Sequence, residues 1–314
     1  MDYAKLGQSD LMVSSIGLGC VTFGREIDEE TSRTVMDHAI ERGLTLFDTA
    51  MGYNDGASEE VIGRWMAKRS CRESVVLATK VSGTLNRKHV LASCEASLRR
   101  LRSDTIDLYL MHNFDPHTPL KETLEALDTL VKHGKVRAIG CSNISARQLA
   151  EALWLQKENG WARFESVQPV YNMVARQIEL ELMPLCREQQ LGVVSYSPLG
   201  AGFLTGKYHP DKPFPKGSRF DTIPGHTDVY YHPDSWQTLD ALRLKSKELG
   251  ISMVQLALAW VFAQPDTSSI LVGARAPAHI DQALEAKERS RLPELSEELS
   301  TLPGMEPCRF KYRF

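Results

Sequence analysis

The chain alternates eight times between a short apolar segment and a longer segment with helical spacing. The apolar segments, such as SVVLATKV and TIDLYLMH, are rich in β-branched residues and have the length of buried strands. The longer segments repeat apolar residues at helical intervals, and several end in glycine, as in PLKETLEALDTLVKHG. The predicted strands span residues 15–20, 44–50, 74–81, 105–112, 136–143, 165–172, 191–199 and 268–275. Such alternation implies parallel strands joined by right-handed crossovers.

The number and size of these units decide between two arrangements of a parallel sheet. Eight strand and helix units over about 270 residues match a closed barrel, whereas an open, doubly wound sheet is the alternative. The sequence therefore predicts an α/β protein with a (β/α)8 TIM-barrel fold, formed by a single domain over residues 1–314. In such a barrel the active site lies at the C-terminal ends of the strands.

Two segments lie outside the repeating pattern. Residues from about 207 to 235 form a polar stretch far longer than the usual connection of ~2 to 6 residues, which indicates a lid or a binding loop. The C-terminal tail, from about 289 to 314, ends in CRFKYRF. Its cations and aromatic residues are compatible with a cap over the site, with a partner contact or with a loosely packed terminus.

The composition restricts the class of partner. Lys and Arg total 37 against 40 for Asp and Glu, so a formal net charge of −3 offers no broad field for nucleic acid or an anionic membrane. The start of the chain lacks the pattern of a secretion signal, and no apolar run approaches the ~20 residues of a membrane span. The six cysteines form no C-x-x-C pair and are too sparse for a disulfide scaffold. We expect a cytoplasmic protein with reduced thiols and a small-molecule partner, without a nucleic-acid or membrane partner.

Polar residues gather at the predicted strand ends. Each one alone is ordinarily a cap or a satisfied core group, but in a closed barrel they converge on one face. That convergence predicts a site. The residues concerned are Cys20, Asp48, Tyr53, Lys80, His112, Ser142, Asn143, Gln168, Tyr196, Ser197, Gly273 and Arg275.

Four of these residues suggest acid catalysis. Asp48 and Lys80 each close an apolar strand, and because a single buried charge is costly we expect them to pair. An ammonium ion beside Tyr53 would lower the phenol pKa from ~10 and make it a usable acid. His112 adds a neutral donor that could hold a carbonyl oxygen against the phenol. A structural ion pair and a core histidine are the alternative interpretations.

Two other patterns are weaker. His112 and His117 lie near Asp115, but this is a loop without a zinc-type pattern, so we predict no metal. Tyr208 and Lys212 match the Tyr-x-x-x-Lys pair of short-chain dehydrogenases, but the proline between them is incompatible with the helix that this pair requires.

Five motifs carry a resemblance to a known family. LFDTAMGY, LATKV, LYLMHN, IGCSN and SYSPLGAGFLTGKY follow one another in the order seen in the aldo-keto reductases. The chain resembles this family over nearly its whole length, in a branch similar to aflatoxin-aldehyde reductases and voltage-gated potassium channel β subunits. The resemblance implies a catalytic tetrad in which Asp48 holds Lys80 and Lys80 tunes Tyr53. Tyr53 would then donate a proton to the carbonyl oxygen that His112 orients.

The resemblance also implies a nicotinamide cofactor, usually NADPH, because no side chain supplies a hydride. Amide and hydroxyl side chains would bond the carboxamide, and the ring of Tyr196 would stack on the nicotinamide. The segment SPLGAGFLTGK, with Lys207, would wrap the pyrophosphate. The implied cofactor contacts are Cys20, Ser142, Asn143, Gln168, Tyr196, Ser197, Leu199, Gly202, Lys207, Gly273, Arg275, His279 and Gln282.

The choice between NADPH and NADH rests on few residues. The family commonly has a basic or amide side chain at the position of His279, an acid at Gln282 and an asparagine at Ala283, so this chain departs from the pattern. Arg275 remains as a cation for a 2′-phosphate. We predict NADPH, with NADH as the alternative.

The predicted function is the reduction of aldehydes or ketones to alcohols, in the manner of an alcohol dehydrogenase or carbonyl reductase. The substrate contacts that we expect are Val21, Met51, Tyr53 and His112, with Phe23 also placed near the pocket. The alternative is a regulatory subunit of the potassium channel β type, which binds the cofactor with little turnover.

Overall fold

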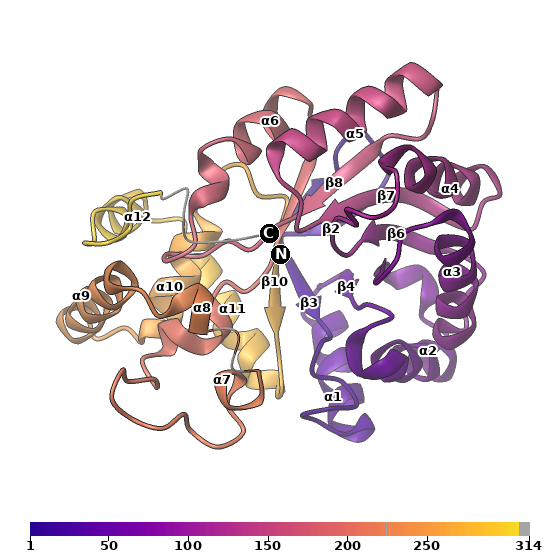
Figure 1. Ribbon diagram of the computed structural model, residues 1–314. Helices are drawn as coiled ribbons and strands as arrows, with labels where there is room; N and C mark the ends of the chain where they lie inside the picture. Colours follow the sequence, from indigo (N-terminus) through magenta and orange to yellow (C-terminus); the bar gives the residue numbers. More distant parts are fainter. Residues whose placement is uncertain (224, 226, 308–314) are drawn as a thin grey trace.

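Eight parallel strands close into a barrel, as the sequence predicts (Figure 1). The computed structural model describes residues 1–223, 225 and 227–307. Around the barrel the strand order is β10-β3-β4-β5-β6-β7-β8-β9, so each strand lies beside its neighbour in sequence and the last closes on the first. The strands are β3 (Ile16–Gly19), β4 (Leu46–Asp48), β5 (Val76–Val81), β6 (Ile106–Met111), β7 (Val136–Ser142), β8 (Phe164–Gln168), β9 (Gly192–Ser195) and β10 (Ser269–Gly273).

Helices surround the barrel and bury their apolar sides against it (Figure 1). Side chains cap several of them: Asp28 accepts from the backbone N–H of Thr31, and Ser145 forms a capping box with Gln148. Gly160, in the left-handed region, ends the helix that Ser145 begins. The helices that follow the strands are α1 (Glu29–Glu41), α2 (Ala57–Arg69), α3 (Arg87–Leu101), α4 (Leu120–Lys132), α5 (Ala146–Asn159), α6 (Leu182–Glu188), α9 (Pro233–Leu249), α10 (Met253–Phe262) and α11 (Pro277–Arg289).

A hairpin that the sequence did not predict closes one end of the barrel. Its strands, β1 (Tyr3–Lys5) and β2 (Met12–Ser14), pair in antiparallel fashion ahead of the first barrel strand. Leu6, Leu11 and Val13 are buried and pack against apolar side chains of the barrel strands. The strands are too short to show a periodic pattern, which is why sequence reasoning missed them.

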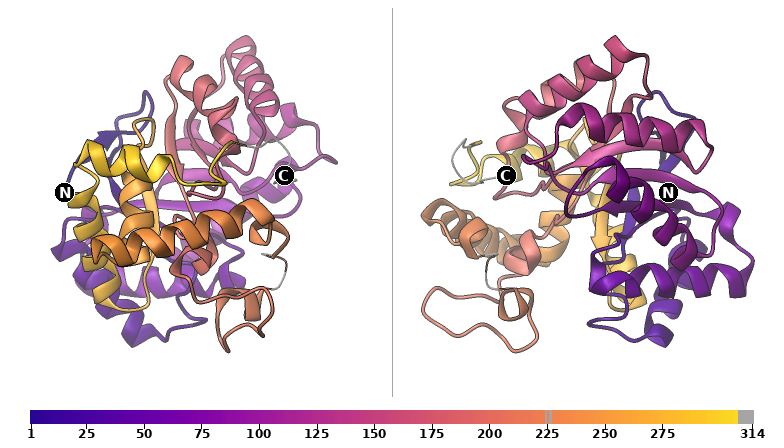
Figure 2. Two further views of the ribbon diagram at one scale, coloured as in Figure 1. Left: turned by 90° about the vertical axis from the view of Figure 1, so that its left-hand side faces the viewer. Right: turned by 45° about the vertical axis from the view of Figure 1, so that its right-hand side comes forward.

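The long segment after β9, predicted as a polar loop, is partly helical and holds several buried aromatic residues. It contains two short helices, α7 (Arg219–Thr222) and α8 (Thr227–Tyr230), before α9 begins at Pro233. Tyr208 and Phe220 are buried and stack with their ring centroids 4.1 Å apart. Figures 1 and 2 show this segment and α9 grouped on one side of the barrel. Aromatic packing therefore gives the segment a small core of its own.

The predicted C-terminal tail begins as a helix. Residues of α12 (Pro293–Ser300) pack on α10, where the indole N–H of Trp260 donates to Ser300 Oγ at 2.9 Å and Leu299 is buried. The motif CRFKYRF, at 308–314, lies outside the described residues. Within the part of the chain that the structure describes, no helix has both the length and the apolar character needed to cross a bilayer.

Candidate active site

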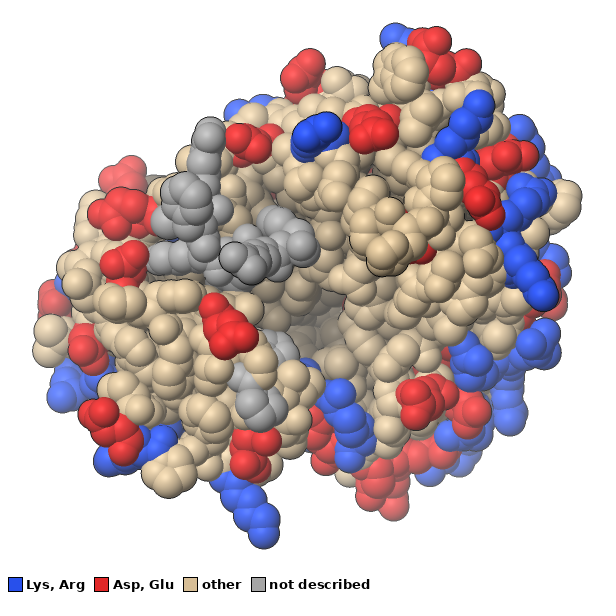
Figure 3. All heavy atoms as spheres, in the orientation of Figure 1, with Lys and Arg blue, Asp and Glu red and all other residues tan. Residues whose placement is uncertain are grey.

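The ends of three neighbouring strands bring together the four residues predicted as a tetrad. Asp48 is the last residue of β4 and lies opposite Ala78, two residues before Lys80 on β5. His112 directly follows β6, and Tyr53 begins a short 3-10 helix after β4. The face seen in Figure 3 is hollowed near its centre, over β3 and β4 as Figure 1 places them. The four side chains thus meet at one face of the barrel.

Lys80 lies at the centre of this group. Its Nζ donates to Asp48 Oδ2 and to the backbone oxygen of Thr49, both at 2.7 Å, and to Tyr53 Oη at 3.2 Å. Burial lowers the pKa of Lys80, but the charge of Asp48 and the hydrogen bonds to Asp48 and Tyr53 outweigh it, so the net shift is upward. Lys80 is therefore an ammonium ion. Because it donates to the phenol oxygen, the phenolic hydrogen of Tyr53 remains available to another acceptor.

The pKa of Tyr53 differs from the prediction. Burial raises this pKa more than the charge of Lys80 lowers it, and Asp48 raises it further. The lysine acts in the predicted direction, but the prediction of a lowered pKa is wrong because desolvation of the phenolate dominates. Tyr53 consequently keeps its proton at neutral pH.

His112 is neutral and faces Tyr53. Burial, with the positive charge of Lys80, lowers the pKa of His112 to about 3. The two rings meet edge to face with centroids 5.7 Å apart. Ring Nδ1 lies 2.8 Å from Ser82 Oγ, on the residue after β5. A neutral imidazole and a neutral phenol are thus adjacent, which suits the polarisation of a carbonyl oxygen.

A second layer of hydrogen bonds supports the tetrad. Gln168 Nε2 donates to Asp48 Oδ1 at 2.8 Å, and Ser142 Oγ donates to the backbone oxygen of Gln168 at 2.7 Å. Tyr196 Oη donates to Asn143 Oδ1 at 2.8 Å, while Asn143 Nδ2 donates to the backbone oxygen of His112 at 3.0 Å. Four residues expected to contact a nicotinamide therefore lie against the tetrad.

Backbone strain accompanies this layer. Asn143 has φ +52° and Ser197 has φ +55°, values that residues with a Cβ seldom adopt. Strain of this kind is commonly kept where a site needs a fixed geometry.

A group of cations lies beside the site. Glu26 is contacted by Arg25 at 2.7 Å, by Arg219 at 3.5 Å and by Arg275 at 3.7 Å. These residues come from the β3 to α1 connection, from α7 and from the β10 to α11 connection. Burial, then the charge of Arg275, lowers the pKa of Lys207, which places a fourth cation within electrostatic reach. Four cations and one acid leave an excess of positive charge that suits phosphate groups.

Gly202 makes room for one of these cations. It has φ +89°, and a Cβ at this position would lie 2.9 Å from Lys207 Nζ. A larger residue would therefore displace the ammonium group. The glycine-rich segment is compatible with a phosphate cradle.

The N-terminal end of α11 lies next to Arg275. The backbone N–H of Arg275 donates to His279 Nδ1 at 3.1 Å, and burial followed by the charge of Arg275 lowers the pKa of His279. His279 is therefore a neutral ring at physiological pH, with Nε2 as its hydrogen-bearing atom. Gln282 is exposed on the same helix.

The remaining predicted residues differ in accessibility. Cys20 is fully buried, and its thiol contacts the backbone oxygen of Leu18 at 3.4 Å. Val21 and Met51 are partly exposed, whereas Phe23 is fully buried. Ser197 and Leu199 are partly exposed, and Gly273 is exposed.

Sequence reasoning missed some residues of this region. Ser82 had a usable signal, because a strand places residues two apart on the same side and Ser82 follows Lys80 by two. Arg25, Glu26 and Arg219 had none, since they lie in irregular segments and only the fold brings them together.

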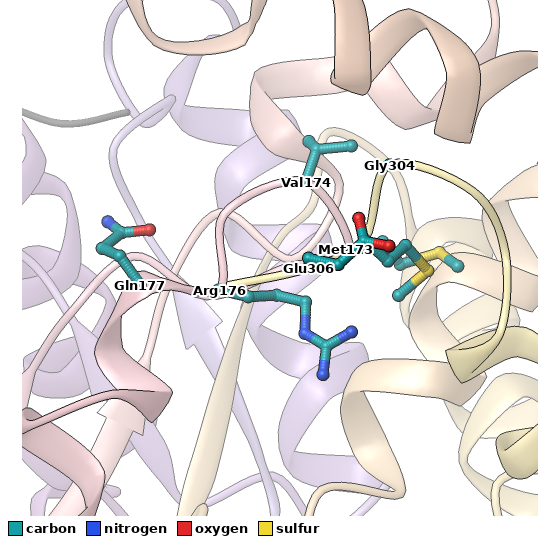
Figure 4. A pocket seen from close by; sticks show the side chains of 7 residues that line it. Met173, Val174, Arg176, Gln177, Gly304 and Glu306 are labelled. Atoms are coloured by element: carbon teal, nitrogen blue, oxygen red, sulfur yellow. The ribbon is translucent and has the colours of Figure 1, made fainter. Parts of the chain in front are cut away.

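Another pocket lies elsewhere on the molecule. It lies between the residues after β8 and those after α12 (Figure 4). None of the predicted site residues lines it, and its arginine is already paired with Glu179 at 2.8 Å. The residues that line this pocket are Met173, Val174, Arg176, Gln177, Gly304, Met305 and Glu306.

Among the described residues, no group of three or more His, Cys, Asp or Glu side chains is arranged to hold a metal ion.

Comparison with known proteins gives a consistent picture. The model of the Aldo/keto reductase family matches residues 15–298. The chain is 34% identical to an uncharacterized oxidoreductase of Bacillus subtilis (strain 168), over 92% of each chain. It is 32% identical to a probable voltage-gated potassium channel subunit beta of Arabidopsis thaliana, over 91% of each chain. It is also 32% identical to an aldo-keto reductase of Bacillus subtilis (strain 168), over 91% of this chain and 88% of the relative.

Proposed function

Because the chain belongs to the aldo/keto reductase family, we propose that it is an NADPH-dependent oxidoreductase that reduces aldehydes or ketones to alcohols. The hydrogen bond from Lys80 Nζ to Tyr53 Oη, at 3.2 Å, carries the proposal. It leaves the phenolic proton free and sets a positive charge beside the oxygen that must lose it. A structural ion pair alone would not require a phenol at this position.

Each member of the tetrad has one task in this proposal. A reduced nicotinamide, when bound, supplies the hydride that no side chain can provide. Tyr53 gives its proton to the carbonyl oxygen, and Lys80 stabilises the phenolate that remains. Asp48 holds Lys80 through their 2.7 Å ion pair, and neutral His112 orients the carbonyl group. Val21 and Met51, partly exposed at the strand ends, complete the proposed substrate contacts.

The described residues fit a dinucleotide carrying several phosphates. The cations around Glu26 would hold these phosphates, with Lys207 seated against Gly202. Arg275 favours a 2′-phosphate and hence NADPH over NADH. Comparable affinities for the two cofactors would contradict that preference. The proposed contacts are Cys20, Ser142, Asn143, Gln168, Tyr196, Ser197, Leu199, Gly202, Lys207, Gly273, Arg275, His279 and Gln282, joined by Arg25 and Arg219.

The cysteines support a reducing compartment. The five cysteines within the described residues are all free. Free thiols at these five positions suit the cytoplasm, where we propose that the protein acts on a small carbonyl compound.

The first test compares the wild type with Tyr53→Phe. NADPH oxidation with an activated aromatic aldehyde is followed by absorbance, and we expect kcat to fall by about 10²- to 10⁴-fold because the ring stays and the proton donor is lost. NADPH affinity, measured by fluorescence titration, should change little. The control is Tyr3→Phe, since this exposed phenol lies on the hairpin strand β1 and donates to the backbone oxygen of Gly43. Near wild-type turnover in Tyr53→Phe would remove this residue from the mechanism.

A second candidate function follows from the relatives. One of them, 32% identical over 91% of this chain, is named as a probable voltage-gated potassium channel subunit beta. A subunit of that kind would bind the cofactor and turn over little. NADPH that stays bound through gel filtration, with negligible oxidation by any aldehyde, would favour this function over the reductase.

A further inference from the structure

Ser82 contacts the imidazole of the tetrad directly. Its Oγ lies 2.8 Å from Nδ1 of His112, and its side chain is partly buried just beyond β5. The contact places a hydroxyl group on the side of the imidazole bearing Nδ1. The other ring nitrogen, Nε2, has no hydrogen-bond partner among the residues that the structure describes.

The rest of His112 is held by neighbouring strands. Its backbone N–H donates to the oxygen of Val81 at 2.9 Å, and its backbone oxygen accepts from Asn143 Nδ2 at 3.0 Å. With Nδ1 bonded to Ser82, only Nε2 is left to act on a bound carbonyl group. Whether it can donate depends on the tautomer, because a neutral imidazole carries one hydrogen on one of its two nitrogens.

Ser82 is itself held in place. His89 on α3 contacts the backbone oxygen of Ser82 through Nε2 at 2.9 Å, and a carbonyl oxygen can only accept, so His89 is the donor. Space for the hydroxyl is left by Gly52, where a Cβ would come within 3.2 Å of Ser82 Oγ. The position of the hydroxyl is thus set by β5, by α3 and by the turn after β4.

The direction of the bond follows from hydrogen-bond accounting. If Nδ1 donated to Ser82, the serine hydrogen would need an acceptor, and none is found for it among the described residues. If Ser82 donates, its hydroxyl hydrogen is bonded to Nδ1 of His112, and only the lone pairs of the serine oxygen remain without a donor. Donation by the serine pairs this hydrogen within the protein without a water acceptor, so it is the favoured direction.

We propose that Ser82 is a positioning residue that donates its hydroxyl hydrogen to His112 Nδ1 and so keeps the imidazole hydrogen on Nε2, directed at the substrate oxygen. This inference rests on the proposed function, because the substrate oxygen is that of the carbonyl group being reduced. In this arrangement Ser82 acts through His112.

The test measures tautomer and turnover in the same proteins. The ¹⁵N chemical shifts of the His112 ring show which nitrogen carries the hydrogen, and the wild type should have it on Nε2. In Ser82→Ala we expect the His112 ring to populate both tautomers. We also expect kcat to fall by about tenfold, because one hydrogen bond that orients the imidazole is lost. Ser82→Thr keeps the hydroxyl and should restore both readouts. NADPH affinity should stay within about twofold in each variant, which also reports correct folding.

Ser246→Ala is the matched control. It removes a partly buried hydroxyl from α9 that donates to the backbone oxygen of Ile251 at 2.6 Å and does not contact His112. Its turnover and its His112 spectrum should equal those of the wild type. Hydrogen on Nδ1 in the wild type, or an unchanged spectrum and kcat in Ser82→Ala, would overturn the proposal. If the wild type reduces no carbonyl compound, the reductase assignment fails separately, while the ¹⁵N spectra still show whether Ser82 sets the tautomer.

Discussion

Lys80 shows how this chain keeps a full charge in its interior. A buried ammonium ion destabilises a protein unless good acceptors surround it, since its desolvation costs several kcal/mol. Here three oxygens lie within 3.2 Å of its Nζ, and one of them belongs to Asp48, which in turn accepts from Gln168. Removal of either charge would leave the other buried and unpaired. The ion pair and the phenol therefore function as one unit.

The neutral His112 predicts a loss of stability in mild acid. Burial and Lys80 lower its folded pKa to about 3, whereas an unfolded histidine titrates near ~6.5. Between these values the unfolded chain binds a proton that the folded chain does not. The free energy of unfolding should therefore fall as pH drops through ~6.5, by about 2 kcal/mol between pH 7 and pH 5 from this group alone, and level off near pH 3.

Urea denaturation at several pH values checks this prediction. Carboxylates also titrate in acid, so the useful quantity is the difference between the wild type and His112→Gln, a variant without the titrating ring. The gap between their unfolding free energies should shrink or reverse as the pH falls from 7 to 5, because only the wild type loses this contribution. Two parallel curves would show that His112 is not buried in its neutral form.

At the scale of elements, the β1 to β2 hairpin acts as a plug for the barrel. Leu11 is 1% exposed and packs with the apolar residues inside the barrel, whereas its neighbour Met12 is 50% exposed. Leu11→Ala should cost about 2–5 kcal/mol of unfolding free energy through lost contacts and a cavity. Met12→Ala should stay within about 0.5 kcal/mol, as is usual for exposed side chains.

Denaturant unfolding and turnover together test the plug. The hairpin precedes the barrel strands, at the end opposite their C-terminal ends, so folded Leu11→Ala should retain the kcat of the wild type at low temperature. Equal destabilisation by both substitutions, or a loss of kcat without a loss of stability, would contradict the role of the hairpin as a structural plug.

The elements differ in how far sequence could predict them. Barrel strands such as β6 (Ile106–Met111) are buried throughout, so their apolar runs stand out from the helical spacing around them. The hairpin strands have three residues each, too few for periodicity to appear. The segment with α7 and α8 reads as polar because its aromatic residues are widely spaced, and only their stacking in the fold reveals a core.

At the scale of the whole molecule, the meeting of the polar strand ends could be predicted from the sequence, but the group of cations around Glu26 could not. Asp48, Lys80 and His112 could be placed together from sequence because a closed barrel brings strand ends to one face. Glu26 and Arg219 are separated by 193 residues, and no local pattern pairs them. The net effect of burial on the pKa of Tyr53 also requires the assembled structure, since desolvation depends on everything that surrounds the ring.

The assembled cations predict how the molecule selects its cofactor. Arg275 is 43% exposed and only loosely paired with Glu26 at 3.7 Å, so its guanidinium is available to a further anion. In Arg275→Ala we expect the Kd of NADPH to rise about 10- to 100-fold and that of NADH less than about threefold, because only NADPH carries the 2′-phosphate. The salt dependence of NADPH binding should also weaken, since one cation fewer is screened. Fluorescence titration of both cofactors measures these effects.

The control is Arg291→Ala, whose side chain pairs with Asp2 at 3.2 Å, away from the site. An equal loss for both cofactors would instead place Arg275 at the pyrophosphate that they share, and the preference for NADPH would then need another source.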